Sequence, residues 1–223
     1  MDGMYIQLDS QVLYYKKCGT GKPLLMLHGN GESHEIFGAL ADDLSGSFTM
    51  YLPDSRGCGL SSPSGDGAYH YTDMARDMSN LIDALSIGTC DVFGFSDGAV
   101  IAMYMAILFP EKVRRLILCG ANMTPSGLTF AAKHKIKKDY RRTKSEMIGM
   151  MLREPDLSDA DLAKIHAPAL VCAGEKDIIK EAETKRIAHG IPDAKLFIVE
   201  GADHGSYVVD STRMAPSIRK FLG

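Results

Sequence analysis

The sequence predicts an α/β fold in which helices cover both faces of a mostly parallel central sheet. Short, continuously aliphatic runs such as 24–27 and 113–119 alternate along the chain with segments of helical periodicity. Strands of a parallel sheet are buried on both faces, so they are apolar throughout, and the alternation supplies the crossover helices. With 223 residues, 45% hydrophobic and 24% charged, the chain suits one globular domain spanning 1–223.

The elements follow in order. The first two short β-like runs flank Asp9-Ser10-Gln11 and predict an opening hairpin. In 71–85 the apolar residues recur at helical spacing, and Thr72 is the expected N-cap. Strands are expected at 5–8, 12–16, 24–27, 48–52, 90–95, 113–119, 169–172 and 196–199. Helices are expected at 36–44, 71–85, 99–108, 181–189 and 211–222.

One stretch, 124–165, interrupts the alternation because it contains no strand-like run. It follows one strand and precedes the next, so we expect a small helical lid over the carboxyl ends of the strands, where ligands bind in such sheets. Its start is rich in basic residues, which either attract an anionic acyl group or form a solvated helix face. These residues are Lys133, Lys135, Lys137, Lys138, Arg141, Arg142 and Lys144, with Asp139 among them. Met147, Met150 and Met151 follow and either line an apolar pocket or pack in the core.

Composition excludes several classes of function. A net charge of −3 gives no indication of a nucleic-acid partner. No apolar stretch approaches the roughly 20 residues that span a bilayer, and the start of the chain lacks a signal-peptide pattern. The five cysteines are expected as reduced core residues and no spacing suggests a metal site, so we expect a cytoplasmic protein, a monomer or a homodimer.

The most informative motif is Gly94-Phe95-Ser96-Asp97-Gly98, a serine between two glycines where an apolar strand meets a helix. A strand that turns into a helix within one or two residues needs close backbone approach, which glycine allows. The turn lifts the Ser96 hydroxyl out of the sheet at a helix N-terminus, whose free N–H groups favour negative charge. Ser96 is therefore the candidate nucleophile.

A serine nucleophile needs a base and an acid that orients the base. His204 follows the last expected strand in Gly201-Ala202-Asp203-His204-Gly205, and Asp177 follows the preceding strand. Both therefore lie at the same edge of the sheet as Ser96. Glu175 is close enough in sequence to replace Asp177 as the acid, whereas Asp203 is expected to point elsewhere on a tight turn.

Acyl transfer also needs hydrogen-bond donors for an oxyanion. The backbone N–H of Asp97, next after the serine, is one candidate. The other is the backbone N–H of Asn30, in the loop His28-Gly29-Asn30-Gly31 after the strand at 24–27. His28 is expected to brace this loop.

These segments together resemble the α/β-hydrolase superfamily, and most closely its small esterases, lactonases and carbon–carbon bond hydrolases, with a reduced lid. The resemblance extends over nearly the whole chain and rests on 28–31, 54–61, 94–98, 109–113, 174–177 and 201–204. It implies a catalytic triad in the chain order Ser96, Asp177, His204, and gives 54–61 a structural role beside the site.

The resemblance implies a carboxylesterase-like serine hydrolase that cleaves an ester or lactone through an acyl-enzyme, without metal or organic cofactor. Two alternatives remain open: cleavage of a carbon–carbon bond or a thioester by the same residues, and a ligand receptor with slow turnover on the same fold. In each case the expected partner is a small molecule.

Overall fold

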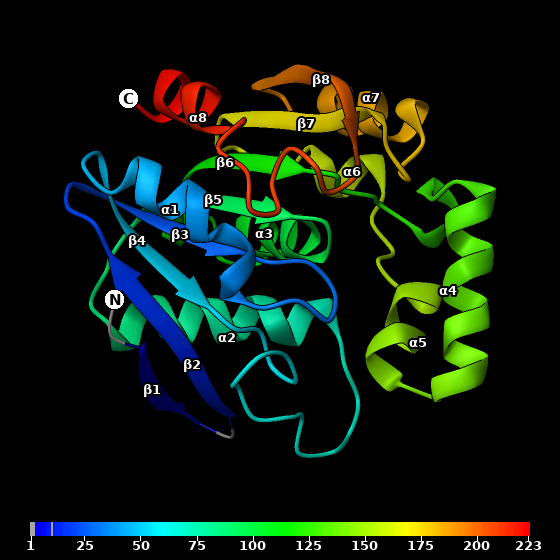
Figure 1. Cartoon of the computed structure of the whole chain (residues 1–223), viewed down its shortest axis with the longest axis horizontal. Helices are drawn as coiled ribbons and strands as arrows, with labels where there is room; N and C mark the ends of the chain where they lie inside the picture. Colours follow the sequence, from blue (N-terminus) through cyan, green and yellow to red (C-terminus); the bar gives the residue numbers. More distant parts are fainter. Residues whose placement is uncertain (1–2, 10) are drawn as a thin grey trace.

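The computed structural model describes residues 3–9 and 11–223, and within these ranges the strands form a single eight-stranded sheet (Figure 1). The sheet order is β1-β2-β4-β3-β5-β6-β7-β8. β2 pairs antiparallel with β1 and β4, and the remaining neighbours pair in parallel. The predicted α/β class and mostly parallel sheet are confirmed. The strands are β1 Gly3–Leu8, β2 Gln11–Cys18, β3 Lys22–Leu27, β4 Phe48–Pro53, β5 Cys90–Phe95, β6 Val113–Cys119, β7 Ala169–Lys176 and β8 Ala194–Asp203.

Helices cover both faces of this sheet. The α-helices are α1 Gly38–Leu44, α2 Tyr71–Ala84, α3 Asp97–Leu108, α4 Phe130–Thr143, α5 Glu146–Arg153, α6 Asp159–Leu162, α7 Glu181–Gly190 and α8 Ala215–Leu222. Short 3₁₀ turns lie at His34–Phe37, Pro110–Lys112 and Pro125–Gly127. No helix in the described ranges is long and apolar enough to cross a membrane.

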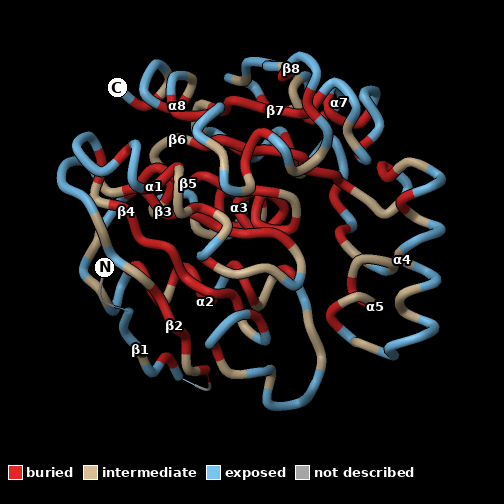
Figure 2. The backbone as a smooth tube through the Cα atoms, in the orientation of Figure 1, coloured by how far each residue is buried: buried red, intermediate tan, exposed pale blue. Residues whose placement is uncertain are grey.

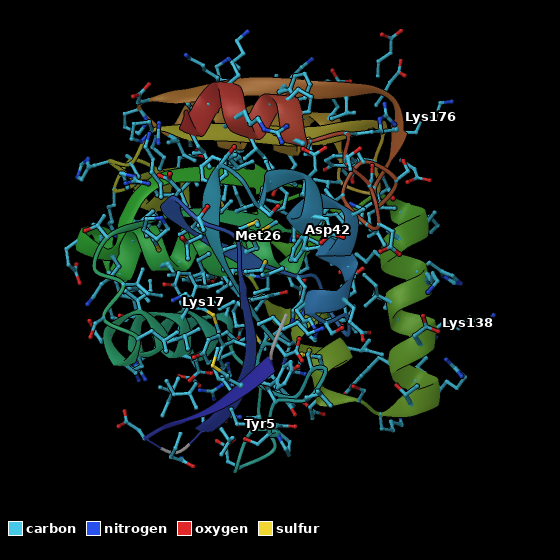
Figure 3. All side chains as sticks on the ribbon, turned by 60° about the vertical axis from the view of Figure 1, so that its left-hand side comes forward. Tyr5, Lys17, Met26, Asp42, Lys138 and Lys176 are labelled. Atoms are coloured by element: carbon cyan, nitrogen blue, oxygen red, sulfur yellow. The ribbon has the colours of Figure 1, made fainter. Side chains whose placement is uncertain are left out.

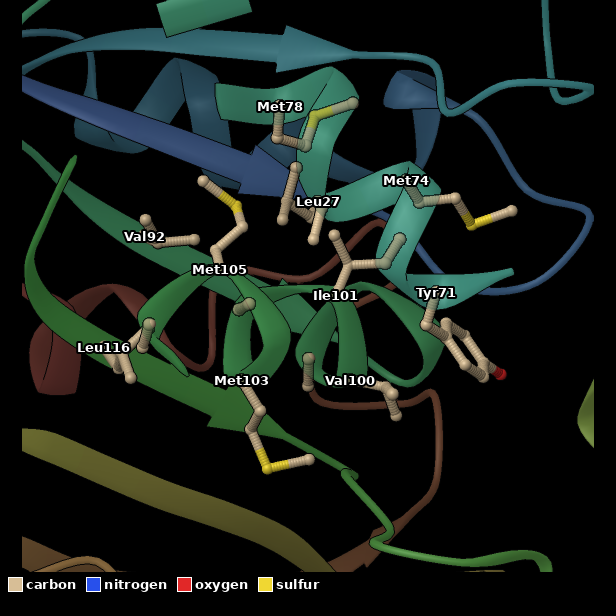
Figure 4. Close-up of a cluster of buried hydrophobic side chains, with 14 of the residues drawn as sticks. Leu27, Tyr71, Met74, Met78, Val92, Val100, Ile101, Met103, Met105 and Leu116 are labelled. Atoms are coloured by element: carbon tan, nitrogen blue, oxygen red, sulfur yellow. The ribbon is translucent and has the colours of Figure 1, made fainter. Parts of the chain in front are cut away.

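Side chains of the central strands alternate between two buried layers, as the two-residue period of a strand requires. Leu25 and Leu27 pack with α2 and α3 on one face, whereas Leu24 and Met26 pack with α1 and α8 on the other. Figure 4 shows the first layer, with Leu27 between Met78 of α2 and Ile101 of α3. Figure 2 shows the resulting buried centre and exposed periphery. Burying each such aliphatic side chain contributes about 1.5–3 kcal/mol.

The predicted hairpin is present as the antiparallel pair β1–β2, although Ser10 in its turn lies outside the described residues. The prediction of a cap at Thr72 is wrong: α2 begins at Tyr71, its N-cap is His70, and no side chain of that residue caps it. The first N–H of α2 instead donates to Oε2 of Glu154 at 3.1 Å, so a distant residue replaces the local cap.

The last helix also begins later than expected. α8 starts at Ala215 rather than near 211, because the preceding residues form a turn in which Ser211 Oγ accepts from the N–H of Arg213 at 3.3 Å. Pro216 lies in the first turn of α8, a position where its missing N–H costs nothing.

The segment 124–165, named here the lid segment, contains α4, α5 and α6 between β6 and β7. In Figure 1, α4 and α5 lie together on the right, beyond the ends of the central strands. Met147 and Met150 pack in the core, which leaves Met151 as the one of the three methionines that lines a cavity.

Candidate active site

Ser96 lies at the junction of β5 and α3 with φ 53° and ψ −119°, a backbone conformation that non-glycine residues rarely adopt. The turn is closely packed. A Cβ on Gly94 would lie 2.4 Å from the carbonyl oxygen of Gly98, and a Cβ on Gly98 would lie 2.1 Å from the carbonyl oxygen of Leu27. Both glycines are therefore required by space, and the serine is held at the start of α3.

His204 and Asp177 extend from Ser96 in a hydrogen-bonded chain. The His204 Nε2 atom lies 3.0 Å from Ser96 Oγ, and its Nδ1 atom lies 2.6 Å from Asp177 Oδ1. His204 follows β8 and Asp177 follows β7, so the parallel sheet brings three loops to one edge. Ser96 and Asp177 lie 108 and 27 residues from His204 in the sequence, and each is joined to it by one hydrogen bond.

The Asp177 carboxyl is held by two further donors, the N–H groups of Gly174 and Ile179, each at 3.0 Å. Burial alone would raise its pKa, but the hydrogen bond and charge of His204, together with these N–H groups, lower the pKa below its usual value. This arrangement favours an ionised Asp177 beside the imidazole.

The competing acids face elsewhere. Glu175 Oε2 accepts from the N–H of Gly201 at 2.8 Å, on the neighbouring strand. Asp203 Oδ1 accepts from the N–H groups of Gly205 and Ser206 at 3.1 and 2.9 Å, within its own turn. Asp177 is therefore the carboxylate that contacts His204.

The two expected oxyanion donors belong to residues near the serine. Asp97 is the first residue of α3, and Asn30 lines the same cavity as Ser96. Across the described ranges, neither of their backbone N–H groups donates to another protein atom. Both remain available for a ligand oxygen.

The Asp97 side chain forms a separate buried network. Asn30 Nδ2 donates to Asp97 Oδ2 at 2.8 Å and also contacts the carbonyl oxygen of Met147 in α5 at 3.2 Å. Burial raises the Asp97 pKa, while the Asn30 hydrogen bond, the nearby Tyr71 hydroxyl and His204 lower it in part. This network joins the serine turn to the lid segment.

A cavity of about 350 Å³ opens at the serine. The residues that the lid segment contributes to its lining are mainly apolar, and the loops contribute most of the polar ones. It is lined by Asn30, Glu32, Phe95, Ser96, Ala132, Lys135, Ile136, Met151, Ile178, His204 and Gly205. The volume lies at the lower end of those of small-molecule sites.

His28 braces the loop below the cavity, as expected. Its Nε2 accepts from the N–H of Ser55 at 2.9 Å, and burial lowers its pKa, which favours the neutral ring. Asp54 accepts from the N–H groups of His34 and Leu60, both at 2.8 Å. The segment 54–61 is thus a hydrogen-bonded support beside the site.

Sequence reasoning missed Glu32 and Tyr71 at this site, and it named Met147 only as a pocket or core residue, without its carbonyl contact to Asn30. Glu32 stands two residues after Asn30, so the position of the loop at a strand end was a usable signal. Tyr71 and Met147 reach the site only through tertiary packing, and no local pattern marks them.

The family follows from comparison with known proteins. A family model described as alpha/beta hydrolase fold matches residues 22–149. The chain belongs to the α/β-hydrolase fold family. Within this family, the 2-hydroxymuconate semialdehyde hydrolase of Pseudomonas putida is 27% identical over 92% of this chain and 88% of its own. The AB hydrolase superfamily protein YisY of Bacillus subtilis is 26% identical over 98% of both chains.

Solved structures show the same α/β-hydrolase fold. A thermophilic esterase from Thermogutta terrifontis, with malate bound, superposes with a TM-score of 0.81 at 23% identity, covering 100% of this chain and 98% of that chain. Together, the relatives support a hydrolase activity. The bond that is hydrolysed differs among the proteins of this family, so it has to be argued from the site.

Proposed function

We propose that this α/β-hydrolase cleaves a carboxylic ester or lactone through an acyl-enzyme on Ser96. The observation that carries the proposal is the chain of hydrogen bonds from Ser96 through His204 to Asp177, with distances of 3.0 and 2.6 Å. It opens into a cavity large enough for a small acyl group.

In the proposed first step, Ser96 Oγ attacks the scissile carbonyl while His204 Nε2 takes the hydroxyl proton. The backbone N–H groups of Asn30 and Asp97 donate to the developing oxyanion, and Asp177 orients and stabilises the imidazolium. His204 then donates the proton to the leaving alkoxide. In the second half, His204 takes a proton from water and the hydroxide formed attacks the acyl carbonyl. The acyl–Oγ bond then breaks, the acid leaves, and His204 returns the proton to Ser96 Oγ.

The cavity suits small substrates and offers apolar surface to the acyl chain. Phe95, Ile136, Met151 and Ile178 contribute apolar surface around the serine, and the volume of about 350 Å³ suits a short acyl chain. Every step above uses side chains and backbone groups of this chain.

A second candidate is hydrolysis of a carbon–carbon bond in a diketone by the same residues. The relative named as a 2-hydroxymuconate semialdehyde hydrolase favours it, because that protein aligns over 92% of this chain. Both candidate functions use Ser96 as the nucleophile. Labelling of Ser96 therefore does not distinguish them, whereas the substrate that is turned over does.

The test is labelling by a fluorophosphonate probe, with Ser96→Ala as control, followed by a turnover screen of aryl esters, lactones and a diketone. The proposal predicts labelling of the wild type alone and faster turnover of an ester or lactone. Labelling with diketone turnover only would favour the second candidate. Saturable binding with negligible product release would favour a receptor, and equal labelling of Ser96→Ala would remove the nucleophile.

A further inference from the structure

A second carboxyl group, that of Glu32, faces the serine but has no part in the proposed steps. Its Oε2 atom accepts from the N–H of Gly29 at 2.8 Å. A Cβ on Gly29 would lie 2.5 Å from this Oε2 atom and 3.1 Å from the Cβ of Ser96. Glu32 and Ser96 therefore flank the same point of the backbone, and both line the cavity with His204.

The negative charge of the Glu32 carboxyl is only partly balanced by its neighbours. In residues 3–9 and 11–223, the hydrogen bond from Gly29 is the one its carboxyl receives, and no basic side chain forms an ion pair with it. Burial raises its pKa and nearby Asp97 adds to this, while the Gly29 N–H and His204 act in the opposite direction. Holding a half-buried carboxylate without a neighbouring cation costs free energy. A ligand that supplies the cation offsets this cost.

The same carboxylate has a direct effect on acyl transfer. A negative charge beside Ser96 repels the oxyanion that forms on the scissile carbonyl, and the repulsion grows as bound substrate displaces water from between the two charges. A positive group on the substrate, close to the carbonyl, would pair with Glu32 and offset this repulsion. An anionic acyl group would add to it.

We propose that Glu32 determines specificity by pairing with a cationic group that the substrate carries near its scissile carbonyl. The inference rests on the proposed function, since it assigns the substrate class of the same site. It makes the preferred substrates small esters or lactones that bear an ammonium group.

The basic residues of α4 do not neutralise the charge of the Glu32 carboxylate. Lys135 is the one among them that lines the cavity; its side chain is 80% exposed and pairs with Asp139 at 2.8 Å. Figure 3 shows Lys138 on the outer side of α4, directed away from the sheet. The interior charge beside the serine is therefore negative, whereas the positive charge of the lid segment lies at the surface.

The test compares two pairs of esters that differ in charge and match in shape. Butyrylcholine and 3,3-dimethylbutyl butanoate place the difference on the alcohol. The p-nitrophenyl esters of 4-(trimethylammonio)butanoate and 5,5-dimethylhexanoate place it on the acyl chain. We expect the wild type to prefer the cation in at least one pair by about tenfold in kcat/KM.

The decisive variant is Glu32→Gln, which keeps an acceptor for the Gly29 N–H and removes the charge. We expect it to lower kcat/KM of the preferred cationic ester about tenfold and to leave its neutral partner equal or faster. The matched control is Glu35→Gln, which removes an exposed carboxylate three residues away, in the 3₁₀ turn that follows, and should leave the ratio unchanged.

A wild type that does not favour the cation in either pair overturns the inference, and this result needs no variant to fold. So does a Glu32→Gln enzyme whose cation-to-neutral ratio stays within twofold of the wild type. If none of the four esters shows turnover that Ser96→Ala abolishes, ester hydrolysis itself fails, and the inference falls with it.

Discussion

At the scale of the residue, hydrogen bonds at both ring nitrogens fix the orientation of the His204 imidazole. The imidazole bonds Ser96 Oγ through one nitrogen and the Asp177 carboxyl through the other. The carboxyl is fixed in turn by the Gly174 and Ile179 N–H groups. The orientation of the ring therefore follows from backbone groups and does not depend on substrate.

Replacing Asp177 with Asn should lower kcat on the order of 10³–10⁴-fold, because the amide no longer stabilises the imidazolium or selects the ring tautomer. Steady-state kinetics on the best ester checks this. Glu175→Gln is the matched control, since Glu175 lies two residues away and bonds Gly201 instead. An equal loss in both variants would show that His204 uses either acid.

Asp97 gives a prediction on stability. Burial raises its pKa, so at neutral pH its ionised form weakens the folded state relative to the unfolded chain. Because the Asp97 pKa is higher in the folded state, protonation favours folding at pH values below the unfolded-state pKa. That stability is lost as the pH rises through the folded-state pKa. Asp97→Asn should therefore raise Tm at pH 7 relative to wild type.

The gain in Asp97→Asn should shrink as the pH falls toward the ordinary aspartate pKa, where wild-type Asp97 is protonated. Thermal unfolding followed by circular dichroism at several pH values measures this. A gain that does not vary with pH would show that packing, and not charge, causes the difference.

At the scale of the element, the lid segment is attached through polar contacts with the loops and with α2. Glu154, directly after α5, accepts from the N–H of Tyr71 at 3.1 Å and contacts His70 Nδ1 at 2.5 Å. The Met147 carbonyl oxygen contacts Asn30. The lid segment thereby supplies the missing cap of α2 and a contact to the loop at 28–31.

Glu154→Ala should destabilise the protein by about 1 kcal/mol, the usual cost of a lost helix cap. It should also speed amide exchange in α5 and in the first turn of α2, measured by hydrogen–deuterium exchange. Glu181→Ala, which removes an exposed carboxylate paired with Lys185, should change neither quantity appreciably. Unchanged exchange in α5 would contradict the role of Glu154 as its anchor.

Sequence patterns predicted the buried strands well: β5 and β6 begin and end where the apolar runs do. They also predicted which residues meet at the serine, because parallel strands place their carboxyl ends at one edge. The prediction of a cap at Thr72 failed because Glu154, 83 residues from Tyr71 in the sequence, supplies the acceptor for the first N–H of α2. Tyr71, Met147 and the direction of Glu32 depend equally on tertiary packing, which local spacing does not encode.

At the scale of the whole molecule, the apolar interior around the sheet contains most of the cysteine side chains. Four of the five cysteines are buried, and Cys18 is half-buried. Burial raises the pKa of Cys58 to about 11 and that of Cys90 to about 12. Their thiols are therefore protonated and inert at neutral pH.

In the native protein at pH 8, a disulfide reagent such as 5,5′-dithiobis(2-nitrobenzoate) should react first and slowly with Cys18. All five cysteines should react after unfolding in guanidinium. Peptide mapping of the modified protein identifies the sites. Rapid reaction of Cys58 in the native state would contradict the buried position of the 54–61 segment.

In the proposed mechanism, the fold presents Ser96 as a nucleophile that becomes acylated during turnover. The most direct measurement of this acylation is acid quenching of the enzyme during pre-steady-state hydrolysis of an aryl ester, followed by mass mapping of peptides. We expect one acyl group per protein, on Ser96, formed at the rate of the aryl-alcohol burst. An acyl group on another residue, or turnover by Ser96→Ala at the wild-type rate, would contradict the account.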